Sequence, residues 1–326
     1  MESSEFMLQL AKELIDTRKI SESTANAYVK TLYILNDKKP FKNLTFLKKI
    51  EPIDEKIAGY AETTKKAILA TIVSVLTMYK DKPTFKKTYQ HFYDKMMEKA
   101  QEAKNVDTSV KTDKQKENWV EWEDIMKKKE ELSEEISKFI NNKTVSANEY
   151  EKLLQHLILS LYSDIPPRRN QDYLLSYIVK KWNDKMPTDK NYLDLAGKQF
   201  VFNKYKTHRE YGQQKLSIPD TLMTVINQYL KFHPIWKGVA KRKNEPIRLL
   251  CLANGTEMTA VNAITRILNK VFGKKVGSSL LRHIYLSDKY KDVSSEQQKD
   301  SIAMGHSVSQ QREYVKTDAQ PKDTDA

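Results

Sequence analysis

Residues 278–316 read SSLLRHIYLSDKYKDVSSEQQKDSIAMGHSVSQQREYVK. The spacing of apolar residues in this stretch predicts a series of short helices rather than strands. We expect these helices at residues 279–291, 295–304 and 308–316. Ser307 and Gln310 have the spacing of a capping box, which fixes where the last helix begins. The stretch therefore predicts a helical C-terminal region that exposes a Gly-His-Ser turn between two helices.

Four residues of this stretch carry side chains that can act on a phosphodiester. Arg282 and His283 lie near the start of the first expected helix, His306 lies in the turn, and Tyr314 lies about two turns into the last helix. Arginine can grip phosphate oxygens at two points, imidazole can move a proton, and a phenol can act as a nucleophile. A single tyrosine among seventeen means little, so Tyr314 gains weight only from these neighbours.

The composition predicts a partner with many negative charges. The chain has 326 residues, a formal net charge of +13 and 30% charged residues. A basic balance of this size favours a polyanion such as DNA, although lysine-rich proteins of other kinds share it. Lysine dominates, so the few arginines stand out as candidates for bidentate phosphate contacts.

Cysteine content and hydropathy predict an intracellular protein. Cys251 is the only cysteine, which rules out a disulfide within the chain and fits a reducing compartment. The histidines show no zinc-ligand spacing, and no apolar run approaches the length of about 20 residues that spans a membrane. The first residues are acidic and amphipathic, unlike a cleavable signal. We expect no metal, no cofactor and no membrane association.

Changes in periodicity predict two domains. Residues 1–104 are expected to form helices throughout, around a central helix that is apolar almost all round. Residues 105–118 lose both periodicity and aromatic content, so we expect a linker there. Residues 119–326 form the second expected domain, with its first helices near 120–141 and 146–162.

A small antiparallel sheet is expected inside the second domain. Tyr192–Leu195, Gln199–Asn203 and Lys215–Ile218 are short apolar segments separated by glycine-containing turns, which is typical of strands. A helix is expected from Asp220. The predicted fold class is therefore mainly α with a small antiparallel β-sheet.

The segment IPPRRNQDYLLSYIV (165–179) combines two adjacent arginines with a predicted helix. After the two prolines we expect the helix to run from Arg168 past Ile178, with both arginines in its first turn. Cations are disfavoured at that end of a helix unless an anion binds there. The alternative is an ordinary surface pair, in which Arg169 bridges to Asp172 on the same helix.

A second cationic segment is FVFNKYKTHREYGQQKLSIP (200–219). It predicts a β-hairpin whose turn carries Lys204, Lys206, His208 and Arg209. A lysine on such an arm can follow DNA into a groove and donate a proton to a leaving oxygen. Taken alone, this segment is better explained as a solvated charge run.

Ser278 or Ser279 is expected to cap the helix that carries Arg282 and His283. This would point both side chains to a position where an anion can bind. The alternative for His283 is a partly buried histidine with a hydrogen-bond partner in the core.

Taken in order, these residues resemble the tyrosine recombinase (phage-type integrase) family. Arg169 followed by Asp172 is similar to the first arginine of the family and its acid, and Lys206 resembles the hairpin lysine. The other three matches are Arg282-His283 with the second-arginine box, His306 with the Gly-His-Ser histidine, and Tyr314 with the nucleophile. The layout is similar over the whole chain, but the motifs are specific only within residues 166–316.

Three points of the family pattern are not matched cleanly. The family usually has histidine or lysine three residues before the second arginine, where this chain has Ser279. Arg168 competes with Arg169 for the first arginine, because the spacing does not fix the register. The interval from His306 to Tyr314 is also one residue shorter than in many bacterial members.

The resemblance implies a metal-independent enzyme that cuts and rejoins double-stranded DNA through a 3′-phosphotyrosyl intermediate. It implies a helical DNA-clamp domain before an α+β catalytic domain, and a homo-oligomer, a tetramer, on recombination sites. DNA integration or recombination for a virus or mobile element, in the cytoplasm, nucleoid or host nucleus, is the expected context. The alternatives are a type IB topoisomerase and a non-catalytic DNA-binding protein on the same fold, the latter favoured by Ser279.

Overall fold

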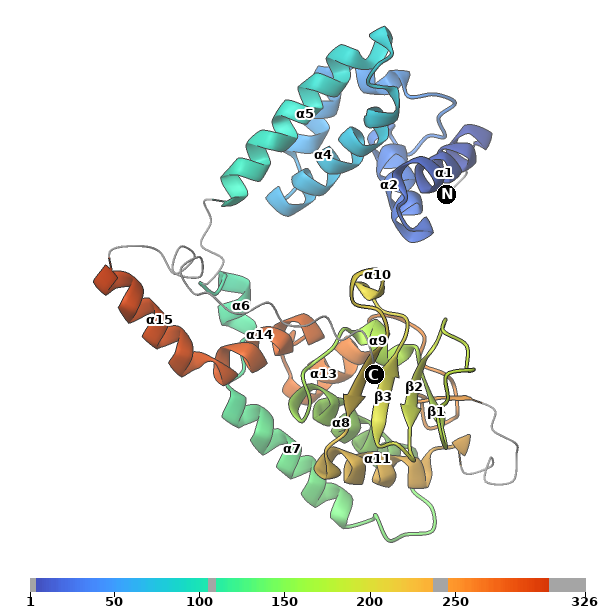
Figure 1. The fold of residues 1–326 in the computed structure, drawn as a ribbon, viewed down its shortest axis with the longest axis vertical. Helices are drawn as coiled ribbons and strands as arrows, with labels where there is room; N and C mark the ends of the chain where they lie inside the picture. The colour runs from blue at the N-terminus through green and yellow to red at the C-terminus, as the bar shows by residue number, and fades with distance from the viewer. Residues whose placement is uncertain (1–3, 105–109, 237–245, 305–326) are drawn as a thin grey trace. The chain divides into compact units, whose positions relative to one another are not determined.

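The computed structural model describes residues 4–104, 110–236 and 246–304 (Figure 1). The chain divides into two compact units, Met1–Val110 and Lys111–Ala326. The described part is mainly helical, with one small sheet in the second unit. This confirms the coarse fold class expected from the sequence.

The first unit is a helical bundle around its own core. Its helices are α1 (Glu5–Arg18), α2 (Glu22–Leu35), α3 (Ile50–Ala58), α4 (Glu62–Leu76) and α5 (Pro83–Lys104), with short 3₁₀ turns at Thr45–Lys48 and Thr77–Tyr79. Ser4 and Ser21 cap α1 and α2 through their side chains, as is typical of helix N-termini. α4 contributes a larger buried set to this core than α1, α2 or α3, because apolar residues occupy most of its circumference beyond the first turn.

The segment expected to be a linker is helical in its second half. α6 (Asp113–Asn118) begins with a capping box between Thr112 and Gln115. Its last residue is buried, and the Asn118 side chain accepts a hydrogen bond of 3.0 Å from the Lys275 backbone N–H. Residues 113–118 therefore belong to the second unit, because the last residue of α6 is hydrogen-bonded to Lys275 of that unit.

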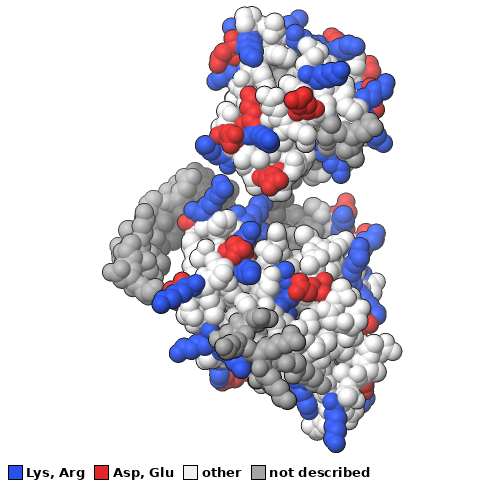
Figure 2. Space-filling model, turned by 90° about the vertical axis from the view of Figure 1, so that its right-hand side faces the viewer, with Lys and Arg blue, Asp and Glu red and all other residues white. Residues whose placement is uncertain are grey.

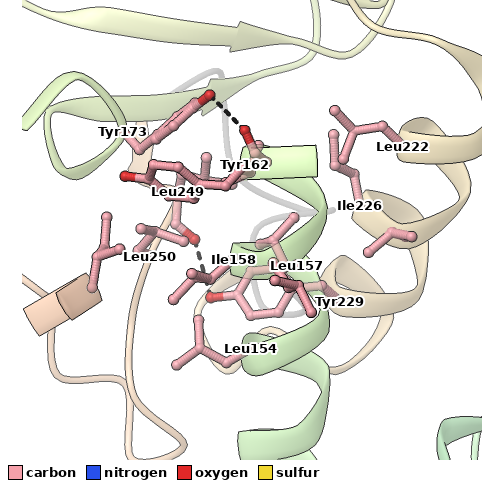
Figure 3. Packing of buried hydrophobic residues seen from close by; sticks show 14 of the residues in the cluster. Leu154, Leu157, Ile158, Tyr162, Tyr173, Leu222, Ile226, Tyr229, Leu249 and Leu250 are labelled. Atoms are coloured by element: carbon pink, nitrogen blue, oxygen red, sulfur yellow. Dashed lines mark hydrogen bonds between the residues drawn. The ribbon is translucent and has the colours of Figure 1, made fainter. Parts of the chain in front are cut away.

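The core of the second unit is built around α8 (Ala147–Ser163), which begins at a capping box between Ser146 and Glu149. α7 (Trp122–Ser137) and α11 (Asp220–Phe232) both pack on α8. In Figure 3, Leu157 of α8 lies toward Ile226 of α11, whereas the Tyr162 ring lies against Tyr173, with ring centroids 5.6 Å apart. Every residue of α8 from Leu153 to Ser163 is buried, so this helix positions the elements on both sides of it.

One five-stranded sheet lies in the second unit, in the order β4-β3-β2-β1-β5. The strands are β1 (Ser176–Val179), β2 (Asn191–Asp194), β3 (Gln199–Phe202), β4 (Gln214–Ser217) and β5 (Ile247–Arg248). β2, β3 and β4 pair antiparallel as expected, but β1 pairs parallel with β2. The sheet is therefore mixed, and the expectation of a purely antiparallel sheet is wrong.

The helix expected from Arg168 past Ile178 is much shorter. α9 spans Asn170–Leu174, and the chain then enters β1. The Ser176 hydroxyl donates to the Asp172 carbonyl at 2.9 Å at this change of direction. Tyr177–Val179 consists of aromatic and β-branched residues, which gain more from packing within a sheet than from continuing a helix.

The remaining described helices lie after β3. α10 (His208–Tyr211) lies within the β3–β4 connection, and α13 (Ala263–Phe272), α14 (Ser278–Lys289) and α15 (Lys291–Met304) follow β5. Gly277 is the N-cap of α14, so the cap expected at Ser278 or Ser279 lies one or two residues too late. Among the described helices, none is long and apolar enough to cross a membrane.

Two buried histidines predict that the second unit loses stability in acid. Burial lowers the pKa of His156 and His233 from 6.5 to about 4, so the folded state disfavours the protonated form. The unfolded chain binds more protons between these values, and stability therefore falls as pH drops from 6.5 toward 4. The loss is on the order of 3 kcal/mol per histidine over the full window.

All four tryptophans, at positions 119, 122, 182 and 236, lie in the second unit. Urea unfolding followed by tryptophan fluorescence at pH 7 and pH 5 therefore measures the effect directly. His156→Phe should remove part of the difference between the two pH values. An equal free energy of unfolding at both pH values would contradict this account.

Candidate active site

Three arginines line one small pocket in the second unit. Arg168 and Arg169 come from the segment between α8 and α9, and Arg282 comes from α14. The pocket has a volume of about 230 Å³. Its other lining residues are Pro167, Asp172, Tyr205, Thr207, Tyr211 and Gln214. Segments more than a hundred residues apart in the sequence thus contribute guanidinium groups to the same cavity.

Arg168 is held rigidly on one wall of this pocket. Its Nε donates to Asp172 Oδ2 at 2.9 Å, and its Nη1 donates to Gln214 Oε1 at 2.8 Å. The guanidinium also stacks on two rings, with Cζ 4.0 Å from the Phe202 centroid and 4.8 Å from that of Tyr205. The ion pair is nearly enclosed, with side-chain exposures of 17% for Arg168 and 4% for Asp172. Arg168 therefore contributes to both the structure and the charge of the pocket.

Arg169 is the N-cap residue of α9 and is half-buried. Within the described residues, no hydrogen-bond partner engages its guanidinium. Burial raises the pKa of the Asp172 carboxyl, and this effect is opposed first by Arg168 and more weakly by Arg169. The acid thus pairs with Arg168, four residues before it, and the pairing of Arg169 with Asp172 considered from the sequence is not formed. The guanidinium N–H groups of Arg169 can therefore bind a different anion.

Arg282 approaches the pocket from the first turns of α14. Its Nη2 donates to the Ser279 hydroxyl at 3.1 Å. Its Nε is buried and has no hydrogen-bond partner among the described residues. A buried guanidinium N–H without a partner is costly, and an anion in the pocket could satisfy it. Ser279, at the position where the resembled family has a cation, instead orients this arginine.

The β3–β4 connection forms the rim of the pocket. Thr207 and Tyr211 line it, whereas Lys206 is exposed and does not. The Asn191 amide anchors the base of this connection, donating to the carbonyls of Asp172 and Lys204 at 2.9 and 3.0 Å. The hairpin expected from the sequence is present, but its turn contains the helical turn α10. Lys206 is thus carried beside the pocket without entering it.

The exposed side chains of His208 and Arg209 lie on α10 and are also outside the pocket lining. His283 follows Arg282 on α14 but is exposed and does not line the pocket, so the partly buried core position considered as its alternative is not formed. Tyr285 packs edge to face on Trp122, with ring centroids 5.7 Å apart. This contact supports a packing role for Tyr285.

His306 and Tyr314 lie outside the described residues, together with the Gly-His-Ser turn. Two other tyrosines line the pocket, Tyr205 and Tyr211. The carboxylate of Glu210 raises the pKa of the Tyr211 phenol, and burial raises that of Tyr205. Neither phenol is therefore activated as a nucleophile at neutral pH. Tyr314 stays the predicted nucleophile.

Several residues that shape the pocket were not predicted from the sequence. Gln214 fixes Arg168, and Tyr205 closes the β3–β4 connection by donating to the Gly212 carbonyl at 2.8 Å. Gly212 has a φ of +63°, a conformation that favours glycine. The Tyr-Gly pair at 211–212 was a signal of this turn, but no signal in the sequence distinguishes Gln214 from its neighbour Gln213.

The pocket carries a net positive charge. Asp172 neutralises one of the three arginines, which leaves two guanidinium charges facing the cavity. Elsewhere lysines and arginines are interspersed with acids, as Figure 2 shows for one face of each unit. The described residues contain no group of His, Cys, Asp and Glu arranged to hold a metal ion. The geometry suits a small tetrahedral anion, such as one phosphate of a nucleic acid backbone.

Comparisons of the chain with protein-family models, curated proteins and solved structures find no match. The resemblance to tyrosine recombinases therefore stays a hypothesis that rests on the residues of this chain.

The two adjacent arginines should differ sharply in their effect on stability. Arg168→Ala leaves the buried Asp172 carboxylate without its cation, so we expect a loss of about 3 kcal/mol or more in the free energy of unfolding. Arg169→Ala removes a side chain without a described partner and should change it by no more than about 0.5 kcal/mol. Urea unfolding monitored by tryptophan fluorescence compares the two variants. Equal destabilisation would show that Arg168 does not hold the pocket.

Proposed function

We propose that this chain is a tyrosine recombinase, which cuts and rejoins double-stranded DNA through a 3′-phosphotyrosyl intermediate. The observation that carries the proposal is the convergence of Arg168, Arg169 and Arg282 on one pocket. Two of these cations have been expected from the sequence to hold the same phosphate, although they lie far apart along the chain. A solvated charge run does not account for a buried Arg282 Nε that faces no described partner.

In the proposed reaction, Arg169 and Arg282 bind the non-bridging oxygens of the scissile phosphate. They stabilise the negative charge that develops at phosphorus in the transition state. The Tyr314 oxygen forms a bond to phosphorus as the bond to the 5′-oxygen breaks. His306 accepts the phenol proton, and Lys206 protonates the departing 5′-oxygen. The phosphotyrosyl bond conserves the energy of the broken linkage, so a 5′-hydroxyl can reverse the step on another strand.

Arg168 has a different role in this proposal. Its Nε and Nη1 donate to Asp172 and Gln214, and its guanidinium stacks on the Phe202 ring. It therefore acts as a positioning residue that sets the backbone of Arg169, and its charge is balanced by Asp172. Arg169 is the better candidate for direct phosphate contact, as its match to the family pattern implies.

The wider context follows from the resemblance. The first unit would close on DNA as a clamp, and the chain would assemble as a tetramer on recombination sites inside the cell, for a virus or mobile element. A type IB topoisomerase would use a similar set of residues but would relax supercoils without strand exchange. Transfer of a labelled strand between two duplexes distinguishes these two activities.

The nucleophile gives the sharpest test of this proposal. Tyr314→Phe removes one hydroxyl, so DNA affinity should be nearly unchanged while the covalent protein–DNA adduct disappears. Tyr211→Phe is the matched control, because Tyr211 lines the pocket and is 60% exposed but is not the predicted nucleophile. Incubation with a nicked suicide substrate and denaturing electrophoresis report the adduct.

Arg169→Ala should also abolish the adduct while the protein stays folded. A covalent band that persists in Tyr314→Phe would place the nucleophile elsewhere. Absence of any band with wild-type protein on DNA that it binds specifically would favour a non-catalytic DNA-binding protein.

Affinity for DNA should depend strongly on salt. Each phosphate contact releases condensed counterions, so the logarithm of the binding constant falls linearly with the logarithm of salt concentration. For six or more contacts, affinity should drop by about a thousandfold between about 50 and 200 mM salt. Fluorescence anisotropy of a labelled duplex measures this slope. A flat response would mean that the net charge of +13 is not used for DNA binding.

A further inference from the structure

A larger cavity lies in the second unit between α7 and α11, with no lining residue in common with the arginine pocket. Its volume is about 810 Å³, within the range of small-molecule sites. Trp122 and Met126 of α7 and Val225 of α11 give it apolar walls, and His156 of α8 also lines it. The cavity is an open groove on the surface of the second unit, with the nearly buried His156 at its base.

α8, which contributes His156 to this cavity, has buried polar atoms without a hydrogen-bond partner among the described residues. His156, Ser160 and Asp164 lie at positions i, i+4 and i+8 of α8 and its C-cap, and so share one face. His156 Nδ1, Ser160 Oγ and Asp164 Oδ2 are each buried with no hydrogen-bond partner among the described residues. Of the three, only His156 lines the cavity, and its residue exposure is 3%. Buried polar atoms are normally satisfied, so a partner at this position would be stabilising.

The charges around the cavity balance. Lys127 and Lys129 line it together with Glu123 and Glu130. Lys129 also pairs with Asp164 beneath the rim. Burial, assisted by the nearby Lys129 charge, lowers the pKa of His156 to about 4, so its imidazole is neutral at pH 7. The lining thus combines an apolar part with the neutral imidazole of His156, and Ser133, Thr221, Thr224 and Gln228 add neutral polar groups at the rim. It has no excess of positive charge that would attract an anion.

We propose that this cavity binds a small uncharged ligand that has an aromatic or alkyl body and one hydrogen-bonding group. The body packs against Trp122, Met126 and Val225, and the polar group bonds to the imidazole of His156. This site is separate from the arginine pocket and does not depend on the proposed recombinase activity.

Two fluorescent probes of the same shape test both the site and its preference for an uncharged ligand. N-phenylnaphthylamine is neutral with a single N–H, and anilinonaphthalene sulfonate adds a negative charge to the same scaffold. We expect one saturable site for the neutral probe, excited by energy transfer from Trp122. It should bind at least about tenfold more tightly there than the sulfonate, although the net charge of the chain favours the anion elsewhere.

Substitutions on α11 locate the binding. Thr224→Trp fills the cavity from an exposed lining position, and should weaken the neutral probe by at least about tenfold. Asn227→Trp is the matched control, since Asn227 is exposed on the same helix and does not line the cavity. His156→Phe keeps the ring but removes both nitrogens, and should weaken binding by about tenfold, the equivalent of one lost hydrogen bond.

Circular dichroism checks that each variant is folded. Three results would overturn the proposal: no saturable binding of the neutral probe, equal loss of binding in Thr224→Trp and Asn227→Trp, or tighter binding of the sulfonate at the Trp122 site. Unchanged affinity in His156→Phe would also overturn it, because the imidazole would then not be the polar partner. None of these results bears on the DNA cleavage test with Tyr314→Phe.

Discussion

The buried ion pair between Arg168 and Asp172 is the interaction on which the arginine pocket depends. Arg168 joins α9 to β3 and β4, because the same guanidinium contacts Asp172, the Phe202 ring and the Gln214 amide. Removing two charges from water is expensive, and only full satisfaction of both groups makes such a pair tolerable. The stacked rings and the amide supply that satisfaction, so the pair fixes where the chain places the next residue, Arg169.

α8 relates this pocket to the rest of the second unit. The hydroxyl of Tyr162, near the end of α8, donates to Asn170 Oδ1 at 2.8 Å. The Asn170 amide in turn donates to the Val261 carbonyl and to Thr265 Oγ1, at 2.9 and 3.0 Å. One asparagine thus ties α9 to the segment that leads into α13 and α14. The position of Arg282 relative to Arg169 is therefore set by buried hydrogen bonds rather than by surface loops.

Much of this arrangement could be predicted from local sequence patterns. The rest could not be predicted, because it depends on contacts between residues that lie far apart in the sequence. Strands were expected at 192–195, 199–203 and 215–218 because glycine-containing turns separate short apolar runs, and β2, β3 and β4 lie within one residue of these bounds. β1 was missed because Tyr173–Ile178 has helical spacing and becomes a strand only by pairing with β2. Likewise the spacing of Asp172 favoured Arg169, whereas Gln214 and the Phe202 ring, more than thirty residues away, select Arg168.

Ser279 shows why a departure from a family pattern need not remove a site. A histidine or lysine at this position would add a cation beside Arg282 and increase the repulsion among the guanidinium groups. The Ser279 hydroxyl instead accepts a hydrogen bond from Arg282, which orients the arginine at no cost in charge. Ser279 thereby orients Arg282, but it does not supply the proton transfer that a histidine or lysine at position 279 could supply. In this chain such a transfer would fall to Lys206 and His306, so the reaction proposed here depends more heavily on the β3–β4 connection that carries Lys206.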